Sequence, residues 1–422
     1  MAVTFRFVGE DQYQVEDGFS LSMMDVLFPG FLISRFMEVR FHCTRIFNRD
    51  FTEAKLKNKN KMDMKLYLDK KDCCGCGACA DCCPQNAVQM MRDAEGFWYP
   101  KIDRTTCTNC GRCRQVCPLK RQDAAEPDNL YLGVQAKDDK LRYSSSSGGL
   151  FSILSEYVIH KNGVVYGAAY NRDMNVVHQA AEERSQLDRI IRTKYVQSDM
   201  TGIYRSIERD LKRGRWVLFC GTPCQAQALI LYLGRVYDRL IVVDLVCYGV
   251  PSPGIWEDYV NCLERRHKGK MTDFSFRDKR NADNGHTRAY VIDGKEYVDS
   301  LYRDFFSRMY FKNRIIRPSC HSCRFCTVRR ESDFTIGDFW GIERSNPGWD
   351  DGMGTSMVIA HTDKAKDIWG EIRQNVRWFV CTEEALLQPR LLKPVAAAVS
   401  RQRFMMLYRI LPFSAMMKLM DR

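Results

Sequence analysis

The sequence DCCGCGACADCCP, residues 72–84, places six cysteines within thirteen positions and contains no histidine. Four of these cysteines and the final proline recur 34 residues later with the same spacing. The first copy consists of Cys73, Cys76, Cys79, Cys83 and Pro84. The second copy consists of Cys107, Cys110, Cys113, Cys117 and Pro118. The chain therefore contains one cysteine motif twice.

Each copy has the spacing C-x2-C-x2-C-x3-C-P, which is typical of proteins that hold two [4Fe-4S] clusters. Three cysteines spaced by two residues can wrap three corners of an iron-sulfur cube, and the fourth, next to proline, ligates the other cluster. The predicted ligands of the first cluster are Cys73, Cys76, Cys79 and Cys117. Those of the second cluster are Cys83, Cys107, Cys110 and Cys113.

Zinc or unligated structural thiols are the alternative interpretation of this block. Structural zinc usually takes four ligands from separated pairs and does not require eight cysteines in a crowded duplicate. Cys74 and Cys82 lie outside the repeated frame. We expect them to be spare thiols or substitute ligands.

The composition indicates a globular chain of two or three domains, with 422 residues of which 45% are hydrophobic. Nineteen cysteines without a recognisable secretion signal predict metal ligation in a reducing, cytoplasmic setting rather than disulfides. The net charge of +12 is weak evidence for nucleic acid, because each cluster with its thiolates adds about two negative charges. We find no nucleic-acid recognition motif, and we expect no membrane span.

Five segments are expected along the chain, in an α+β fold. Residues 1–63 form an N-terminal extension, which is a linker or precedes a true start at Met62 or Met64. Residues 64–125 form a ferredoxin-like dicluster domain, with a predicted hairpin over residues 87–102 between its two motifs. Residues 126–215 and 216–400 form a mixed α/β body, and residues 401–422 form a tail. Alternating strands and helices in the body predict a partly parallel sheet that is covered on both faces.

A second group of cysteines lies in the predicted body. Cys224 and Cys247 each follow a predicted strand, and Cys320 and Cys323 form a C-x2-C loop. If the two strands are parallel neighbours, their carboxyl ends meet at one edge of the sheet, where α/β proteins build sites. The group can form a third four-thiolate site, but buried apolar cysteines and a zinc site fit the spacing equally well.

A Ser/Gly-rich segment, SSSSGGLFSILSEYV, starts at Ser144 and leads into an amphipathic helix. Backbone N–H groups at such a helix start can bind a phosphate. Serine is also a routine helix cap and Gly-Gly a routine turn, so the structural interpretation is favoured on this segment alone. The seven histidines, His321 among them, are expected to be structural or exposed, as are Cys43, Cys262 and Cys381. No catalytic residue is identified.

Several ordered motifs resemble the coenzyme F-420 hydrogenase/dehydrogenase beta-subunit family over about residues 130–400. They are SSSSGG, TKYVQS at 193–198, GTPCQ at 221–225, VCYGVPS at 246–252, the C-x2-C at 320 and SDFTIGDFWG at 332–341. The tandem motif in front resembles members in which a dicluster ferredoxin is fused to a flavoprotein body.

The resemblance implies FAD and a third [4Fe-4S] cluster in the body. It assigns the third cluster to Cys224, Cys247, Cys320 and Cys323, which leaves Cys220 and Cys326 as spare thiols. It places FAD against Ser147, Gly148, Gly149, Lys194 and Tyr195, with Gly337 and Asp338 nearby.

The implied function is that of an FAD- and [4Fe-4S]-dependent oxidoreductase. It would transfer electrons between a hydride carrier or reducible substrate, through FAD, and one-electron carriers, through the clusters. The expected partner is a redox protein, a deazaflavin or another hydride carrier, and a hetero-oligomer is compatible with this function. The alternative is a non-catalytic electron-transfer subunit of a larger hydrogenase, dehydrogenase or reductase.

Overall fold

The structure is a computed structural model that separates into two units, Met1–Asp63 and Met64–Arg422. It describes residues 66–120, 128–280 and 287–420, and in the first unit the backbone of residues 5–9, 12–15 and 20–21. In that unit β1 (Phe5–Gly9), β2 (Gln12–Val15) and β3 (Ser20–Leu21) pair antiparallel in this order. The expectations for Cys43, Met62 and Met64 lie outside the described residues.

The two cysteine motifs fold in the same way, each leading into one turn of helix. The helices are α3 (Ala78–Asp81) and α4 (Arg112–Gln115). Gly77 and Gly111 precede them at equivalent positions, with φ of 80° and 77°. Glycine takes this left-handed conformation without the steric cost that a Cβ brings. Short 3-10 turns flank the domain, η1 (Lys70–Asp72) and η2 (Pro118–Lys120).

The predicted hairpin between the motifs is confirmed as β4 (Val88–Arg92) and β5 (Trp98–Ile102), which pair antiparallel. Asp93 closes its turn, because one carboxylate oxygen accepts hydrogen bonds from the backbone N–H groups of Glu95 and Phe97.

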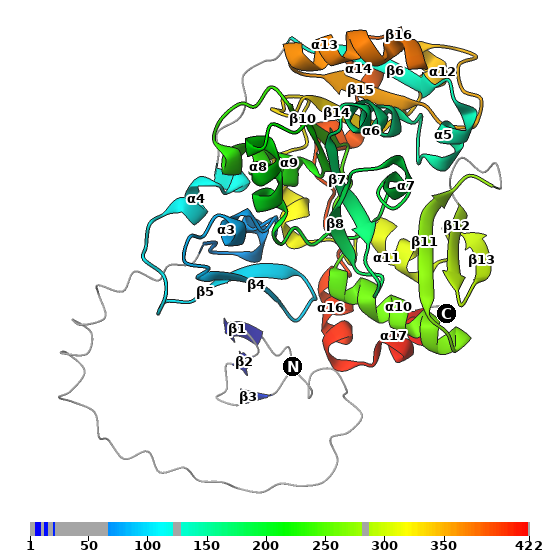
Figure 1. Cartoon of the computed structure of the whole chain (residues 1–422). Helices are drawn as coiled ribbons and strands as arrows, with labels where there is room; N and C mark the ends of the chain where they lie inside the picture. Colours follow the sequence, from blue (N-terminus) through cyan, green and yellow to red (C-terminus); the bar gives the residue numbers. More distant parts are fainter. Residues whose placement is uncertain are drawn as a thin grey trace, which may run out of the picture. The chain divides into compact units, whose positions relative to one another are not determined.

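The body is built on an eight-stranded mixed sheet, shown in Figure 1, with the strand order β16-β6-β15-β14-β10-β9-β7-β8. In chain order the strands are β6 (Leu130–Ala136), β7 (Val164–Tyr170), β8 (Val176–Ala181), β9 (Val217–Gly221), β10 (Leu240–Leu245), β14 (Phe334–Asp338), β15 (Ser356–Ala360) and β16 (Val376–Val380). Strands β7, β9, β10 and β14 run parallel, and the other pairs are antiparallel. The expected partly parallel sheet is therefore confirmed.

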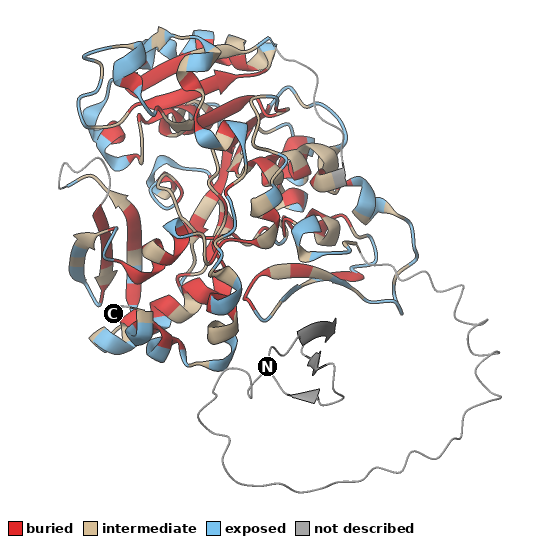
Figure 2. Ribbon diagram, turned by 180° about the vertical axis from the view of Figure 1, so that it is seen from behind, coloured by how far each residue is buried: buried red, intermediate tan, exposed pale blue. Residues whose placement is uncertain are grey.

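Both faces of this sheet are buried. Successive side chains of a strand point to opposite faces, and in β9 the side chains on each face pack against helices. Leu218 of β9 packs with α6 (Leu150–His160) and α13 (Asp363–Ile372). Its neighbours Val217 and Phe219 pack with α8 (Ile203–Lys212), α9 (Pro223–Leu233) and the first cysteine motif. Figure 2 shows the sheet as a buried layer between more exposed helices. The ferredoxin-like domain thus shares a hydrophobic core with the body.

A second sheet, which the sequence did not predict, contains β11 (Met271–Asp278), β12 (Thr287–Ile292) and β13 (Lys295–Ser300) in antiparallel order. It packs with α10 (Pro253–His267), α11 (Phe305–Phe311), α16 (Arg401–Ile410) and α17 (Phe413–Met420) around the fully buried Trp256. The remaining short elements are α5 (Asp139–Ser144), α7 (Arg184–Leu187), η3 (Pro318–Ser322), α12 (Ile342–Ser345), η4 (Arg373–Asn375), α14 (Glu383–Leu386) and α15 (Pro389–Leu392). Within the described ranges, no helix has both the length and the apolar character to cross a bilayer.

The hairpin of the ferredoxin-like domain is fixed to the start of α10. Ser252 Oγ donates to the Glu95 carbonyl at 2.6 Å, and Gly254 N donates to the Gly96 carbonyl at 3.2 Å. A Cβ on Gly254 would lie 2.7 Å from Gly96 Cα, so the two backbones approach more closely than any side chain allows. Arg401 also pairs with the buried Glu95 at 2.6 Å.

A buried ion pair fixes the loop that carries the C-x2-C motif. Asp244 of β10 accepts from Arg330 Nη1 at 2.5 Å, and each side chain is 3% exposed. Arg330 also donates to the carbonyls of Leu245, two residues before Cys247, and Phe325, which lies between Cys323 and Cys326. Two cysteine-bearing segments are therefore held by one guanidinium.

Gly254→Ala is expected to lower the free energy of unfolding by about 1–3 kcal/mol, because the added methyl group overpacks a backbone contact. The matched control is Gly370→Ala in α13, where nothing lies within 4 Å of the new Cβ. That change should raise the free energy of unfolding by about 0.5–1 kcal/mol, the helix-propensity gain of alanine over glycine. Chemical denaturation of the full chain measures both, and equal effects would contradict the close approach.

Arg330→Met is expected to lower the free energy of unfolding by about 3–5 kcal/mol, because it leaves Asp244 buried and unpaired. Adding Asp244→Asn to this variant should recover part of the loss, since the amide carries no charge. Additive losses in the double variant, measured by the same denaturation, would show that the pair is not coupled.

Candidate metal centres and flavin site

The four predicted ligands of the first cluster line one cavity. Cys73 follows η1, Cys76 and Cys79 flank the start of α3, and Cys117 follows α4. The cavity is completed by Leu66, Tyr67, Asp72, Cys74, Gly75, Gly77, Met90, Pro100, Cys113 and Val116. The second motif therefore contributes to the cavity of the first, through Cys113 and Cys117, and the assignment of Cys117 as the fourth ligand stays a prediction.

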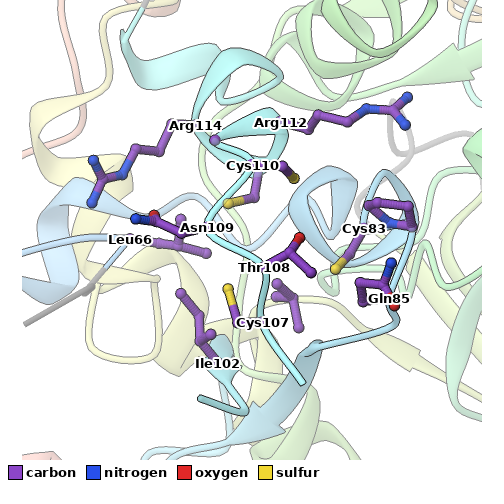
Figure 3. A pocket seen from close by; sticks show the side chains of 14 residues that line it. Leu66, Cys83, Gln85, Ile102, Cys107, Thr108, Asn109, Cys110, Arg112 and Arg114 are labelled. Carbon is purple, nitrogen blue, oxygen red and sulfur yellow. The ribbon is translucent and has the colours of Figure 1, made fainter. Parts of the chain in front are cut away.

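The four predicted ligands of the second cluster line another cavity, shown in Figure 3. They are Cys83, Cys107, Cys110 and Cys113, and the sulfur atoms of the first three point toward one common space. Cys83 comes from the first motif, so each motif contributes to both cavities. Cys110 is exposed, whereas Cys76 in the other cavity is buried. The cysteines of the second set are therefore more exposed than those of the first.

Burial favours the neutral form of several of these thiols. It raises the pKa of Cys79 well above its ordinary value, with neighbouring Cys73 adding to the shift, and it raises the pKa of Cys113. A bound cluster needs thiolates, so its positive iron core must offset this cost and protons are released on binding. Within the described ranges, no three His, Cys, Asp or Glu side chains converge on a single-ion site.

The four candidate thiols of the body also come together, at the edge of the large sheet. Cys220 of β9 pairs in register with Val243 of β10. Cys224 lies at the start of α9 and Cys247 just after β10, so both follow the carboxyl ends of neighbouring parallel strands. Burial raises the pKa of Cys247, and Cys320, Cys224 and Cys323 add to the shift, so the four thiols lie within interaction range.

The thiols outside the predicted sets fall into two groups. Cys74 and Cys224 are close enough for each thiol to shift the pKa of the other, and Cys326 lowers the pKa of Cys323 to about 7. Cys74 therefore places the first motif beside the body set, which consists of Cys224, Cys247, Cys320 and Cys323. The spacing of the repeat gave no signal of this proximity. Cys82 donates to the Cys79 carbonyl at 3.5 Å. Cys220, Cys262 and Cys381 are single thiols, on β9, in α10 and after β16.

The Ser147–Gly149 loop precedes α6, as the sequence predicts, but its polar groups have partners within the protein. Ser147 Oγ donates to the Thr355 carbonyl at 3.0 Å, and Gly148 N donates to Ser356 Oγ at 3.0 Å. A Cβ on Gly148 would lie 2.1 Å from the Val134 carbonyl oxygen. This packing accounts for the glycine without a ligand.

The other predicted flavin residues lie around β11. Burial lowers the pKa of Lys194 to about 7, and its Nζ donates to the Arg189 carbonyl at 2.8 Å. Asp338 forms an ion pair with Arg277 of β11, and Tyr195 lies 5.2 Å from the Phe276 ring of the same strand. A Cβ on Gly337 would lie 2.8 Å from Val246.

Two cations in this region were not predicted from the sequence. Lys279 Nζ donates to the carbonyls of Arg142, Ser147 and Met353 at 2.8–2.9 Å, and burial lowers its pKa to about 8. Arg277 lies near the end of β11 and Lys279 directly follows its last residue, Asp278, and this short charged stretch gives no sign in the sequence that sets it apart from an ordinary strand end. Three positive side chains, Arg142, Arg277 and Lys279, therefore surround the predicted flavin loop.

Aromatic rings connect this region to the body cysteines. Tyr195 lies 5.2 Å from the Tyr310 ring. Tyr310 is buried close to Cys247 and Cys320, and both thiols add to its burial-raised pKa. Tyr310 also donates to the Gly249 carbonyl, two residues beyond Cys247, at 3.1 Å.

Comparison with known proteins identifies three matched regions. Residues 214–384 match the family that comprises the C-terminal domain of the coenzyme F420 hydrogenase/dehydrogenase beta subunit, and residues 72–120 match a "4Fe-4S dicluster domain". A second dicluster model matches residues 99–149, which contain only four cysteines and continue into β6 and α5. We therefore take residues 72–120, with all eight ligand candidates, as the dicluster domain.

Among solved structures, one similar chain belongs to the F420-reducing [NiFe] hydrogenase complex from Methanosarcina barkeri. It is 15% identical, with a TM-score of 0.40, over 70% of this chain and 91% of that chain. The curated proteins contain no match.

The dicluster match supports [4Fe-4S] clusters and an electron-transfer role for the N-terminal side of the chain. The predicted resemblance is confirmed at the level of these domains. Residues 72–120 match a 4Fe-4S dicluster domain, and residues 214–384 match the C-terminal domain of the coenzyme F420 hydrogenase/dehydrogenase beta subunit.

Proposed function

We propose that the chain is an iron-sulfur flavoprotein oxidoreductase. It passes electrons between a hydride carrier or reducible substrate, at FAD, and one-electron carriers, through three [4Fe-4S] clusters. The main support is that the predicted ligands of each cluster line one cavity, to which both motifs contribute, although Cys113 lines both cavities. Such a contribution of both motifs is what a two-cluster ferredoxin domain requires, and zinc ligation does not need it.

The order of the sites supports a path for single electrons. The second set is exposed at Cys110, the first set is more buried, and Cys74 of the first motif contacts Cys224 of the body set. From the body set, Tyr310 and Tyr195 lead toward Arg277 and Asp338. The proposed sequence of sites is therefore flavin, body cluster, first cluster and second cluster.

The cations near the Ser147–Gly149 loop already have partners within the protein: Arg142 pairs with Asp351, Arg277 pairs with Asp338, and Lys279 donates to three carbonyls. We therefore base the FAD proposal on the family resemblance, with Tyr195 packing against the ring system. When bound, FAD accepts two electrons as a hydride and gives them up singly. The residues of this chain bind and orient the cofactor, and none is assigned as a proton donor.

The exposed second set supports an acidic one-electron carrier as the protein partner. Arg112 and Arg114, both exposed, extend from α4 on either side of the cavity (Figure 3). Opposite charge steers such encounters and makes them sensitive to salt. A deazaflavin is the proposed hydride carrier, by resemblance to the family.

A second candidate is a non-catalytic electron-transfer subunit without flavin. It is favoured by the internal hydrogen bonds of Ser147 and Gly148, which leave that loop with fewer free donors. Flavin content distinguishes the two candidates: about one FAD per chain supports the oxidoreductase, and clusters without flavin support the carrier.

Cys117→Ser is expected to remove the first cluster and lower the iron content of anaerobically prepared protein from about twelve to about eight per chain. The matched control is Cys82→Ser, which changes a cysteine of the same domain outside the repeated frame. The control should retain the wild-type iron content. Equal iron loss in both variants would contradict the predicted ligand sets.

Stopped-flow mixing of the reconstituted protein with a reduced deazaflavin tests the function. The flavin absorbance in the blue should bleach first, and cluster absorbance should follow as single electrons leave the flavin. Flavin that is reduced while every cluster stays oxidised would overturn the proposed path.

A further inference from the structure

Arg317 differs from the other buried arginines of the described chain. Four arginines are buried there, and three have carboxylate partners: Arg142 with Asp351, Arg288 with Asp304, and Arg330 with Asp244. Arg317 is 0% exposed, yet its hydrogen-bond partners are backbone carbonyls, an amide oxygen and a sulfur. A buried charge without a counter-ion costs several kcal/mol, so this arginine calls for an anion that the polypeptide itself does not supply.

The guanidinium of Arg317 lies against the first motif. Its Nε donates to the Cys73 carbonyl at 2.9 Å, and one Nη lies 3.7 Å from Cys73 Sγ. The same Nη donates to the Trp98 carbonyl at 2.9 Å, and the group stacks 4.2 Å from the Tyr99 ring centroid. These contacts hold the positive charge at the wall of the first cavity.

The backbone of Arg317 is hydrogen-bonded to the segments that carry the candidate cysteines of the body. Arg317 N donates to the Val250 carbonyl, and the Arg317 carbonyl accepts from Cys320 N, both at 3.0 Å. Gln197 secures the side chain, because its Oε1 accepts from Arg317 and its Nε2 donates to the Cys74 carbonyl, both at 2.9 Å. One residue thus connects the C-x2-C loop to the first motif.

The first motif has room for the Arg317 side chain only because residue 75 is a glycine. A Cβ on Gly75 would lie 2.6 Å from an Arg317 Nη, and Gly75 has a φ of +67°. The glycine is thus required by the guanidinium as well as by the turn.

We propose that Arg317 is a positioning residue that sets the reduction potential of the first cluster and fixes that cluster relative to the body set. This proposal rests on the proposed function, because it takes the first cavity to hold a [4Fe-4S] cluster. Adding one electron changes the cluster with its four thiolates from a charge of about −2 to about −3. The fixed cation interacts more favourably with the reduced state, and its hydrogen bond to Cys73 acts in the same direction.

Potentiometric titration of the reconstituted full chain, followed by electron paramagnetic resonance, tests this role. The signal that is absent from Cys117→Ser identifies the first cluster. In Arg317→Met, the ratio of reduced to oxidised first cluster should fall at least tenfold at a given potential. This corresponds to a shift of the reduction potential by about 59 mV to more negative values. Arg317→Lys keeps the charge but loses the planar fork, and it should shift the potential in the same direction by less.

Arg205→Met is the matched control. Arg205 also clamps the ferredoxin-like domain, donating to the Asp81 carbonyl at 2.6 Å and to Asn86, but none of its hydrogen bonds reaches a sulfur. An unchanged potential in both Arg317 variants, or an equal shift in the control, would overturn the role. If Arg317→Met fails to retain the first cluster, the test rests on Arg317→Lys. A reduction potential of the first cluster equal to that of the wild type in Arg317→Lys would then overturn the proposed role. Wild-type protein that holds no clusters would instead overturn the proposed function.

Discussion

The convergence of thiols from distant segments is the constraint on which the rest of the structure depends. Each predicted ligand set of the dicluster domain takes three cysteines from one motif and one from the other, and each cavity is lined by both motifs, so neither half can complete a site alone. Burial favours neutral thiols, as the raised pKa of Cys79 shows, and iron must offset that preference. The stability of this domain is therefore expected to depend on its metal, and its few short elements are consistent with that dependence.

The body meets the same constraint by using a sheet instead of a repeated loop. Strands β9 and β10 are parallel neighbours, and Cys224 and Cys247 both follow their carboxyl ends. The third and fourth thiols come from a loop that has no such template. That loop is secured instead by Arg330, whose pairing with the buried Asp244 links it to the end of β10. The sheet thus supplies half of the set directly and the anchor for the other half.

The sequence predicted well those features that depend on short-range spacing. The hairpin and five strands of the large sheet, β7, β9, β10, β14 and β15, follow from local periodicity, whereas β6, β8 and β16 were not predicted. The second sheet was missed because its strands mix polar and apolar residues without a clear alternation. Cys74 was interpreted as a spare thiol, since its contact with Cys224 depends on a packing between residues 150 positions apart. Arg317 and Lys279 were missed for the same reason: a basic residue in a loop or strand carries no local sign of burial.

Charge connects these missed residues to the composition of the chain. The formal net charge of +12 suggested a polyanionic partner, and the described structure places several of the positive groups inside the protein. Arg317 is fully buried without a carboxylate partner, and Lys279 is held by three carbonyls. Burying such groups is favourable only if anions are buried with them. The three proposed clusters with their thiolates would contribute about six negative charges and the proposed dinucleotide about two more, so the proposed cofactors would offset most of the basic excess. Under the proposed function, the basic composition and the cysteine content are two aspects of one requirement, the burial of anionic redox centres inside a protein.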